Sequence, residues 1–272
     1  MKTTIFVCPF AQFGNPGTQR GAELLGDAVR ELLDDNRHER RPTRSGVYQE
    51  HVHIKELALD TPAQYDGWRT KARVAAKDAL DAGEFLIWIG GNHLSVMPLY
   101  EELGARDRSL IVQFDAHLDI YHHDDTKQDL SHGNFIRYLP EPRPEIVNIG
   151  HRDQFLRTEE IHEHFAAAVG AITLGNDGIE KKLAAGIRRA SRVAIDIDWD
   201  VLDPAYFPAV DDALPFGLTS QQLLRHMHAV WNDKTCSVAF SEFNPSRDNN
   251  DRSLQLAIWL VEQALLWKYE GM

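Results

Sequence analysis

Short apolar runs alternate along most of the chain with longer stretches whose apolar residues recur every three or four positions. The short runs are typical of buried parallel strands, and the spaced stretches have the periodicity of amphipathic helices. Because repeated strand–helix order covers a parallel sheet with helices on both faces, the pattern predicts an α/β fold. The predicted strands are Thr4–Cys8, Val52–Ile54, Phe85–Ile89, Ser109–Phe114, Ile146–Ile149, Ala171–Leu174, Arg192–Ile195 and Ser237–Phe240.

Helices are predicted between these strands. Gly83 follows the second helix as a stop signal, and Ser95 precedes the third as a candidate N-terminal cap. No internal repeat, low-complexity tract or Pro/Gly-rich linker interrupts the order, so we expect one domain over residues 1–272. The helices are predicted at Gly21–Leu33, Trp68–Ala82, Val96–Leu103, Glu159–Ala167, Ile179–Arg189, Thr219–Trp231 and Leu254–Trp267.

The composition narrows the class of protein. A net charge of −12 disfavours binding to nucleic-acid phosphates. Cys8 and Cys236 are far apart and form no Cys-x-x-Cys pair, so neither a disulfide framework nor a zinc knuckle is indicated. The N-terminal apolar run is too brief for a signal peptide, and no run approaches the roughly twenty residues of a membrane span. We therefore expect a cytoplasmic protein that binds neither nucleic acid nor membranes.

Potential metal ligands follow the strand predicted at Ser109–Phe114. They are Asp115, His117 and Asp119, and ligands of α/β proteins bind at the carboxyl ends of parallel strands. If the extended geometry persists through them, these alternate side chains project to the same side. A single Asp-x-His pair is weak evidence, because a histidine beside a strand is more often a structural residue. A second cluster is needed to favour a metal.

That second cluster lies about eighty residues later, where Asp196 and Asp198 follow an apolar run that begins at Arg192. An unpaired buried carboxylate costs several kcal/mol, so two on one strand face need a positive partner. An Arg or Lys is the simpler partner, but Arg192 is the only one in either motif and lies at the far end of its strand. The two clusters together therefore predict bound divalent cations.

Polar motifs also end other predicted strands. Gly90–His93 brings two glycines and an imidazole, Ser131–Gly133 places His132 in a loop, and Glu242 follows the last strand. Each motif alone is common turn chemistry or a solvated strand end. Because the carboxyl ends of parallel strands meet at one edge of a sheet, their convergence indicates a single polar site.

In order along the chain, these segments resemble the signatures of the ureohydrolase family, which comprises arginase, agmatinase, guanidinobutyrase, formiminoglutamase and relatives. The resemblance covers nearly the whole chain and implies a three-layer α-β-α sandwich with a mostly parallel eight-stranded sheet. It also implies two manganese ions at the carboxyl edge of the sheet and hydrolysis of a guanidino group with release of urea. The matching segments are GGNH at Gly90–His93, DAHLD at Asp115–Asp119, SHG at Ser131–Gly133, AIDIDWDVLDP at Ala194–Pro204 and EFNP at Glu242–Pro245.

Roles for individual residues follow from the same resemblance. His132 resembles the loop histidine that passes a proton to the leaving amine, and Glu242 resembles the carboxylate that pairs with the guanidinium. Asp115 and Asp196 would bridge the two ions, which share the attacking water. One Mn²⁺ would be held by His93, Asp115, Asp119 and Asp196, and the other by Asp115, His117, Asp196 and Asp198.

Departures from the family bear on the substrate. In arginase, polar groups in the loop after the DAHxD motif hold the carboxylate of free arginine, and here Tyr121, Gln128 and Leu130 stand in those places. Phe155 stands where arginase has an acidic residue that helps to bind the α-amino group. We therefore expect the site to bind free arginine poorly.

The expected substrate is instead agmatine-like or an arginine side chain within a peptide. We expect Glu242, Tyr121 and Asp153 to contact it. The acidic loop residues Asp124, Asp125 and Asp129 either meet a cationic substrate tail or form a solvated loop.

Three alternatives to this expectation stay open. The first is a true arginase that acts on free arginine, the second is a single-zinc enzyme similar to histone deacetylases, and the third is a relative that binds a ligand without catalysis. A one-zinc site has no need for carboxylates at both Asp119 and Asp198, and a non-catalytic relative would be expected to lack a ligand. The filled set of six ligand positions therefore favours a two-metal hydrolase, which the resemblance implies is a trimer or hexamer.

Overall fold

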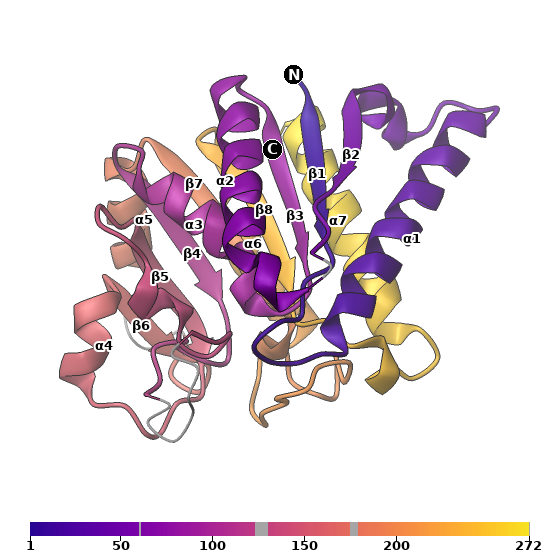
Figure 1. Ribbon diagram of the computed structural model, residues 1–272. Helices are drawn as coiled ribbons and strands as arrows, with labels where there is room; N and C mark the ends of the chain where they lie inside the picture. Colours follow the sequence, from indigo (N-terminus) through magenta and orange to yellow (C-terminus); the bar gives the residue numbers. More distant parts are fainter. Residues whose placement is uncertain (60, 123–129, 175–178, 272) are drawn as a thin grey trace.

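Eight strands form one sheet in the computed structural model, which describes residues 1–59, 61–122, 130–174 and 179–271. Every neighbouring pair of strands is parallel, so the carboxyl ends of the strands meet at one edge, the lower edge in Figure 1. The strand order is β2-β1-β3-β8-β7-β4-β5-β6. The strands are β1 Thr3–Cys8, β2 Val52–Glu56, β3 Phe85–Gly90, β4 Ser109–Phe114, β5 Glu145–His151, β6 Ala167–Gly170, β7 Arg192–Asp198 and β8 Thr235–Ser241.

Helices cover both faces of this sheet and bury two apolar cores. Along β7, Val193, Ile195 and Ile197 point into the core beneath α1, α5, α6 and α7, whereas Ala194 points into the core beneath α2 and α3. This alternation is what a sheet buried on both faces requires, and it confirms the predicted three-layer sandwich. The helices are α1 Thr18–His38, α2 Tyr65–Asp81, α3 Met97–Gly104, α4 Thr158–His164, α5 Ile179–Arg189, α6 Ser220–Val230 and α7 Arg252–Glu270.

The predicted strand at Ala171–Leu174 is wrong. The eighth strand of the sheet is instead β6, in which Ala167 pairs with Val147 of β5. The apolar side chains of Ala167 and Val169 are buried in the sheet, whereas Ile172 is 70% exposed in a turn. The helix predicted before this strand therefore ends earlier, at His164.

Ser95 does not cap the third helix. The chain leaves β3 through a short 3-10 turn at His93–Val96, and α3 begins only at Met97 with Pro98 in its first turn. The side chain of Ser95 makes no capping hydrogen bond. That 3-10 turn holds His93 at the sheet edge, which matters for the site below.

No helix within the described ranges is a candidate for a membrane span. None of the helices there is both long enough and apolar enough to cross a bilayer.

Close packing of α1 against the sheet edge gives a test of the fold. Gly21, in the first turn of α1, touches the backbone of Phe243, and a Cβ there would collide with the carbonyl oxygen of Phe243. We expect Gly21→Ala to lower the free energy of unfolding by about 1–3 kcal/mol, the usual cost of overpacking. Urea denaturation followed by circular dichroism measures this change.

The matched control is Gly67→Ala in the first turn of α2, where nothing lies within 4 Å of the added methyl group. Alanine favours a helix over glycine, so this variant should gain up to about 1 kcal/mol. Equal denaturation midpoints for the two variants would contradict the packing of α1 described here.

Candidate functional site

A cavity of about 240 Å³ opens at the carboxyl edge of the sheet. Its walls come from loops that follow several different strands, which is the usual place for a ligand in a parallel α/β fold. Among the described residues that line it, none is a lysine or arginine. The lining residues are Asn15, His93, His117, Asp119, Tyr121, His132, Gly133, Asp198, Asp200, Asp212 and Glu242.

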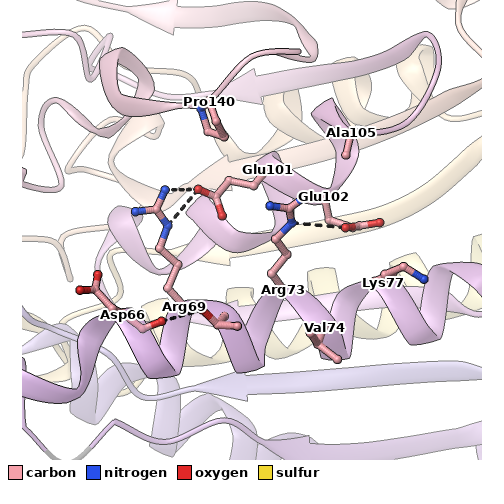
Figure 2. A pocket seen from close by; sticks show the side chains of 10 residues that line it. Asp66, Arg69, Arg73, Val74, Lys77, Glu101, Glu102, Ala105 and Pro140 are labelled. Carbon is pink, nitrogen blue, oxygen red and sulfur yellow. Dashed lines mark hydrogen bonds and ion pairs between the residues drawn. The ribbon is translucent and has the colours of Figure 1, made fainter.

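A larger cavity of about 740 Å³ lies elsewhere, against the outer helices (Figure 2). Its basic side chains already have partners, since Arg69 of α2 pairs with Glu101 of α3 and Arg73 lies 3.5 Å from Glu102. No strand end contributes to its described walls. The smaller cavity at the sheet edge is therefore the better candidate for chemistry.

His93 is the centre of a first group of potential metal ligands in that smaller cavity. Its Nδ1 atom lies 3.2 Å from Asp115 Oδ2, 2.8 Å from Asp119 Oδ2 and 3.3 Å from Asp198 Oδ2. The nitrogen and the first two oxygens are buried and make no hydrogen bond within the described structure. Neighbouring ligands on an octahedral cation with bonds of about 2.1 Å lie about 3 Å apart, so this spacing fits a shared ion.

A second group adjoins the first and shares Asp115 with it. Asp115, His117 and Asp200 offer ligand atoms that all lie within 4.8 Å of one another. His117 Nδ1 lies 2.7 Å from Asp200 Oδ2 and 3.9 Å from Asp115 Oδ1. Two imidazoles and four carboxylates thus form two adjoining clusters whose donor atoms suit divalent ions such as Mn²⁺.

The ligands after β4 converge for a different reason from the one that the sequence suggested. Extended geometry stops at Phe114, so strand alternation does not place them. Instead Asp115 Oδ1 accepts a hydrogen bond from the His117 backbone N–H at 2.6 Å, and Asp119 takes a left-handed φ of 50°. Such backbone strain in a non-glycine residue is typical of functional sites.

The ligands after β7 are placed by the end of that strand. Asp198 is its last residue and Asp200 lies in the following 3-10 turn. Asp198 Oδ1 accepts the Asp200 backbone N–H at 3.0 Å, and Asp200 Oδ1 accepts the Ala116 N–H at 3.0 Å. The Arg152 guanidinium donates to the carbonyl oxygens of Asp200 and Val201 at 2.5 and 2.9 Å, which fixes the turn.

Asp196, which the sequence assigned as a bridging ligand, lies apart from both groups. It sits within β7, paired with Gln113 and Ala239 of the flanking strands, and it does not line the cavity. Its Oδ2 atom is 2.8 Å from His93 Nε2, on the opposite side of the ring from the ligand oxygens. Asp200 takes its place in the cavity, and the alternation of Asp196, Asp198 and Asp200 was the signal that could have identified it.

His132 and Glu242, which the sequence analysis expected at this edge of the sheet, lie beside one another in the cavity. His132 Nδ1 lies 3.5 Å from Glu242 Oε1, which also accepts the His93 backbone N–H at 2.7 Å. Gly14 packs closely against the His132 ring, and a Cβ atom at this position would collide with the imidazole. Glu242 also has a left-handed φ, of 69°.

Two further lining residues were missed by the sequence analysis. The Asn15 side-chain amide donates to Glu242 Oε2 at 2.9 Å and to Asp212 Oδ2 at 3.0 Å, so it links the two carboxylates. Asn15 follows the first strand within the turn-rich segment 13–17, which was an available signal. Asp212 lies in a loop with no pattern that distinguishes it.

The residues predicted to contact substrate separate into two groups. Tyr121 lines the cavity, with its ring centroid 6.5 Å from that of His117. Asp153 does not line it, since its Oδ2 accepts the backbone N–H groups of Phe155 and Leu156 in a turn. Asp124, Asp125, Gln128 and Asp129 lie outside the described residues.

The burial of so many carboxylates disturbs their ionisation. Burial raises the pKa of Asp115 to about 7, and the charges of Asp119 and Asp200 add to the effect. Burial also raises the pKa of Asp198 well above its ordinary value, reinforced by the charges of Asp200 and Asp115. These groups resist carrying negative charge together, and divalent cations would relieve that repulsion.

The histidines supply the positive charge that the described cavity walls otherwise lack. Burial by itself lowers the pKa of His117, but the charge and hydrogen bond of Asp200 raise it to about 10. Burial likewise opposes protonation of His132, yet the hydrogen bond and charge of Glu242, with smaller effects of Asp119 and Asp212, raise the pKa of His132 to about 9. His132 is therefore protonated at neutral pH.

Comparison with known proteins gives a consistent result. The family model described as Arginase family matches residues 2–267. The N(1)-aminopropylagmatine ureohydrolase of Thermus thermophilus is 28% identical over 238 residues, which are 85% of this chain and 78% of that protein. The agmatinase of Bacillus anthracis is 30% identical over 193 residues, which are 69% of this chain and 65% of that protein.

Solved structures share the fold. The arginase of Bacillus subtilis superposes with a TM-score of 0.79 and 18% identity, covering 97% of this chain and 98% of that one. The agmatine ureohydrolase of Thermoplasma volcanium superposes with a TM-score of 0.79 and 20% sequence identity, and the match covers 100% of this chain and 92% of that one. At such low sequence identity, these two matches show that the fold is shared, and no more than the fold.

His132 provides a direct test of this electrostatic arrangement. We expect its imidazole to titrate near 9 in the metal-free protein, and Glu242→Gln to lower that pKa toward the ordinary 6.5. Because the folded-state pKa is raised, the stabilisation from this pair is complete below about pH 6.5 and is lost as the pH rises through about 9. Chemical shifts of labelled histidine, followed by NMR against pH, measure the pKa.

The matched control is Asp212→Asn, which removes a weaker and more distant charge and should shift the His132 pKa less. A wild-type pKa close to 6.5 would contradict the pairing of His132 with Glu242.

Proposed function

This chain belongs to the arginase family, and from that premise we propose that it is a two-metal hydrolase that cleaves a guanidino group to release urea and an amine. The observation that carries the proposal is the pair of adjoining ligand groups that share Asp115 beside Glu242 and His132. A site for one zinc ion has no use for this many carboxylates. A purely structural histidine cluster would not leave buried ligand atoms without hydrogen bonds.

We propose a revised set of ligands for the two ions, which we infer to be Mn²⁺. Asp115 belongs to both groups, and we assign Asp198 to both ions as well, because it lies 3.3 Å from His93 Nδ1 and accepts the Asp200 backbone N–H. Asp200 replaces Asp196 in the proposed set. Bound here, the cations would supply a water that loses its proton near neutral pH and acts as the nucleophile. One ion would be held by His93, Asp115, Asp119 and Asp198, and the other by Asp115, His117, Asp198 and Asp200.

The other wall of the cavity binds the substrate and supplies a proton. The Glu242 carboxylate pairs with the planar guanidinium, and such a match of charge and shape fixes its orientation over the ions. Asn15 holds Glu242 Oε2 in place. His132, whose pKa is raised by the hydrogen bond and charge of Glu242, would donate its proton to the departing amine as the carbon–nitrogen bond breaks.

The substrate class proposed is a guanidino compound with a cationic or neutral tail, such as agmatine. Asp212 adds a negative charge to the cavity, and no described lining residue is a lysine or arginine that would bind the carboxylate of free arginine. Phe155 is 81% exposed, in the place where arginase carries an acidic residue for the α-amino group. The curated relatives described above are named for agmatine and aminopropylagmatine, which agrees with this preference.

Urea release tests the function directly. The Mn²⁺-loaded protein is assayed with arginine, agmatine, 4-guanidinobutyrate and an arginine-containing peptide, and we expect agmatine to have the highest kcat/KM. A preference for free arginine would overturn the proposed substrate class, whereas preference for the peptide would move it to peptidyl arginine. No urea from any of the four, with two ions bound, would overturn the proposed activity.

His132→Asn separates proton transfer from binding. We expect kcat to fall by about 10²–10⁴-fold, the usual contribution of a general acid, with little change in the number of ions bound. The steady-state assay is accompanied by metal analysis of the same sample. Loss of both ions together with activity would assign His132 to metal binding and contradict its role as proton donor.

Asp200→Asn tests the revised ligand set. We expect bound manganese to fall from two ions to one per chain, because the second group loses the one carboxylate that it does not share with the first. The control Asp107→Asn alters a carboxylate whose side chain is 79% exposed and should retain two ions. Retention of two ions with unchanged affinity by Asp200→Asn would contradict the assignment.

A further inference from the structure

Three buried side chains form a hydrogen-bonded series behind the proposed metal site. The Tyr100 hydroxyl donates to Asp196 Oδ2 at 2.6 Å, and the same oxygen lies 2.8 Å from His93 Nε2. Each of the three residues is only 1% exposed. They come from α3, β7 and the turn after β3, so the series joins the sheet to the helix layer above it.

The two ring nitrogens of His93 face different surroundings. Nδ1 points to the oxygens of Asp115, Asp119 and Asp198, whereas Nε2 points to Asp196 alone. A neutral imidazole donates from one nitrogen and offers a lone pair at the other. A proton on Nε2 donated to Asp196 leaves the Nδ1 lone pair directed at the cavity.

Phe135 encloses this arrangement. Its ring lies edge-on against both His93 and Tyr100, with centroid distances of 5.2 and 5.5 Å, and it is fully buried. Exclusion of water strengthens a hydrogen bond to a carboxylate. Gln113, the neighbour of Asp196 on β4, makes no hydrogen bond to His93 in the described structure and instead accepts one from Asn148.

We infer that Asp196 is a positioning residue that selects the tautomer and orientation of His93, and that Tyr100 holds Asp196 in place. The inference rests on the proposed metal site, because its effect acts through His93 as a ligand. A carboxylate behind a ligating histidine increases the basicity of the imidazole and fixes its ring, and loss of such a partner typically weakens metal binding by about 10–100-fold. Asp196 thus supports the metal without touching it.

Titration with Mn²⁺ alone distinguishes this positioning role from two alternatives, in which Asp196 is a metal ligand or only stabilises the fold. For Asp196→Ala we expect two ions per chain, as in the wild type, but a Kd for the ion at His93 that is about 10–100-fold higher. Asp196→Asn keeps an oxygen that accepts the Nε2 proton, so it should recover most of the affinity. Tyr100→Phe should weaken binding less than Asp196→Ala. The stoichiometry comes from metal analysis and the Kd from calorimetry.

Gln113→Met is the matched control, since it replaces a buried polar residue in the same row of the sheet that makes no hydrogen bond to Asp196 or His93 in the described structure. We expect its Mn²⁺ affinity to equal that of the wild type. The midpoint of thermal unfolding of each metal-free variant is measured alongside, so that a loss of stability is not mistaken for a loss of affinity.

Several results would overturn the inference. Loss of one ion by Asp196→Ala would make Asp196 a ligand, and an unchanged Kd with a lower unfolding midpoint would make it a scaffold residue only. Failure of the wild type to bind Mn²⁺ would remove the site altogether, whereas metal binding without urea release would overturn the proposed activity but leave this inference standing.

A second measurement avoids the risk that a variant fails to fold. In the wild-type protein loaded with diamagnetic Zn²⁺, ¹⁵N NMR of histidine should find His93 protonated at Nε2 and ligated through Nδ1. The opposite tautomer would overturn the inference whatever the variants show.

Discussion

Mutual repulsion among buried carboxylates is the constraint on which this structure depends. Asp115, Asp119 and Asp198 are at most 4% exposed and face a single imidazole nitrogen. Burying several like charges together is costly unless a positive partner is present, and no described lining residue is a lysine or arginine. The two divalent cations that we propose would satisfy this requirement. The parallel sheet makes the arrangement possible, because it brings the ends of β4 and β7 to the same edge.

The remaining polar groups around the site act mainly on its shape. Arg152 holds the turn that carries Asp200 through backbone carbonyls, and Asn15 holds Glu242 through its side-chain amide. Asp119 and Glu242 keep left-handed backbone conformations that cost free energy in any non-glycine residue. Such strain persists only where the surrounding structure fixes it, so the backbone at Asp119 and Glu242 is held by its neighbours.

The cavity has two walls with different charges and different chemical uses. The wall built on β4 and β7 concentrates carboxylates for cations, and the wall built on β8 and the loop of His132 pairs an acid with a protonated imidazole. The guanidinium of the proposed substrate is planar, cationic and rich in N–H donors, and so complements the Glu242 carboxylate. Asp212 adds a further carboxylate to the lining of the cavity, which is consistent with the proposed substrate whose tail is not an anion.

The sequence alone determined the fold class, and its motifs contain most of the residues that line the candidate cavity. Alternating apolar runs and helical periodicity predicted the sandwich, and motifs after five strands identified the polar edge. Period-two alternation in the sequence could not decide among Asp196, Asp198 and Asp200, because it would place all three on one face of an extended strand. In the tertiary structure β7 ends at Asp198, so that Asp198 and the following Asp200 line the cavity whereas Asp196 lies behind His93. Asn15 and Asp212 likewise depend on the folding of distant loops against Glu242, a contact that local sequence patterns do not encode.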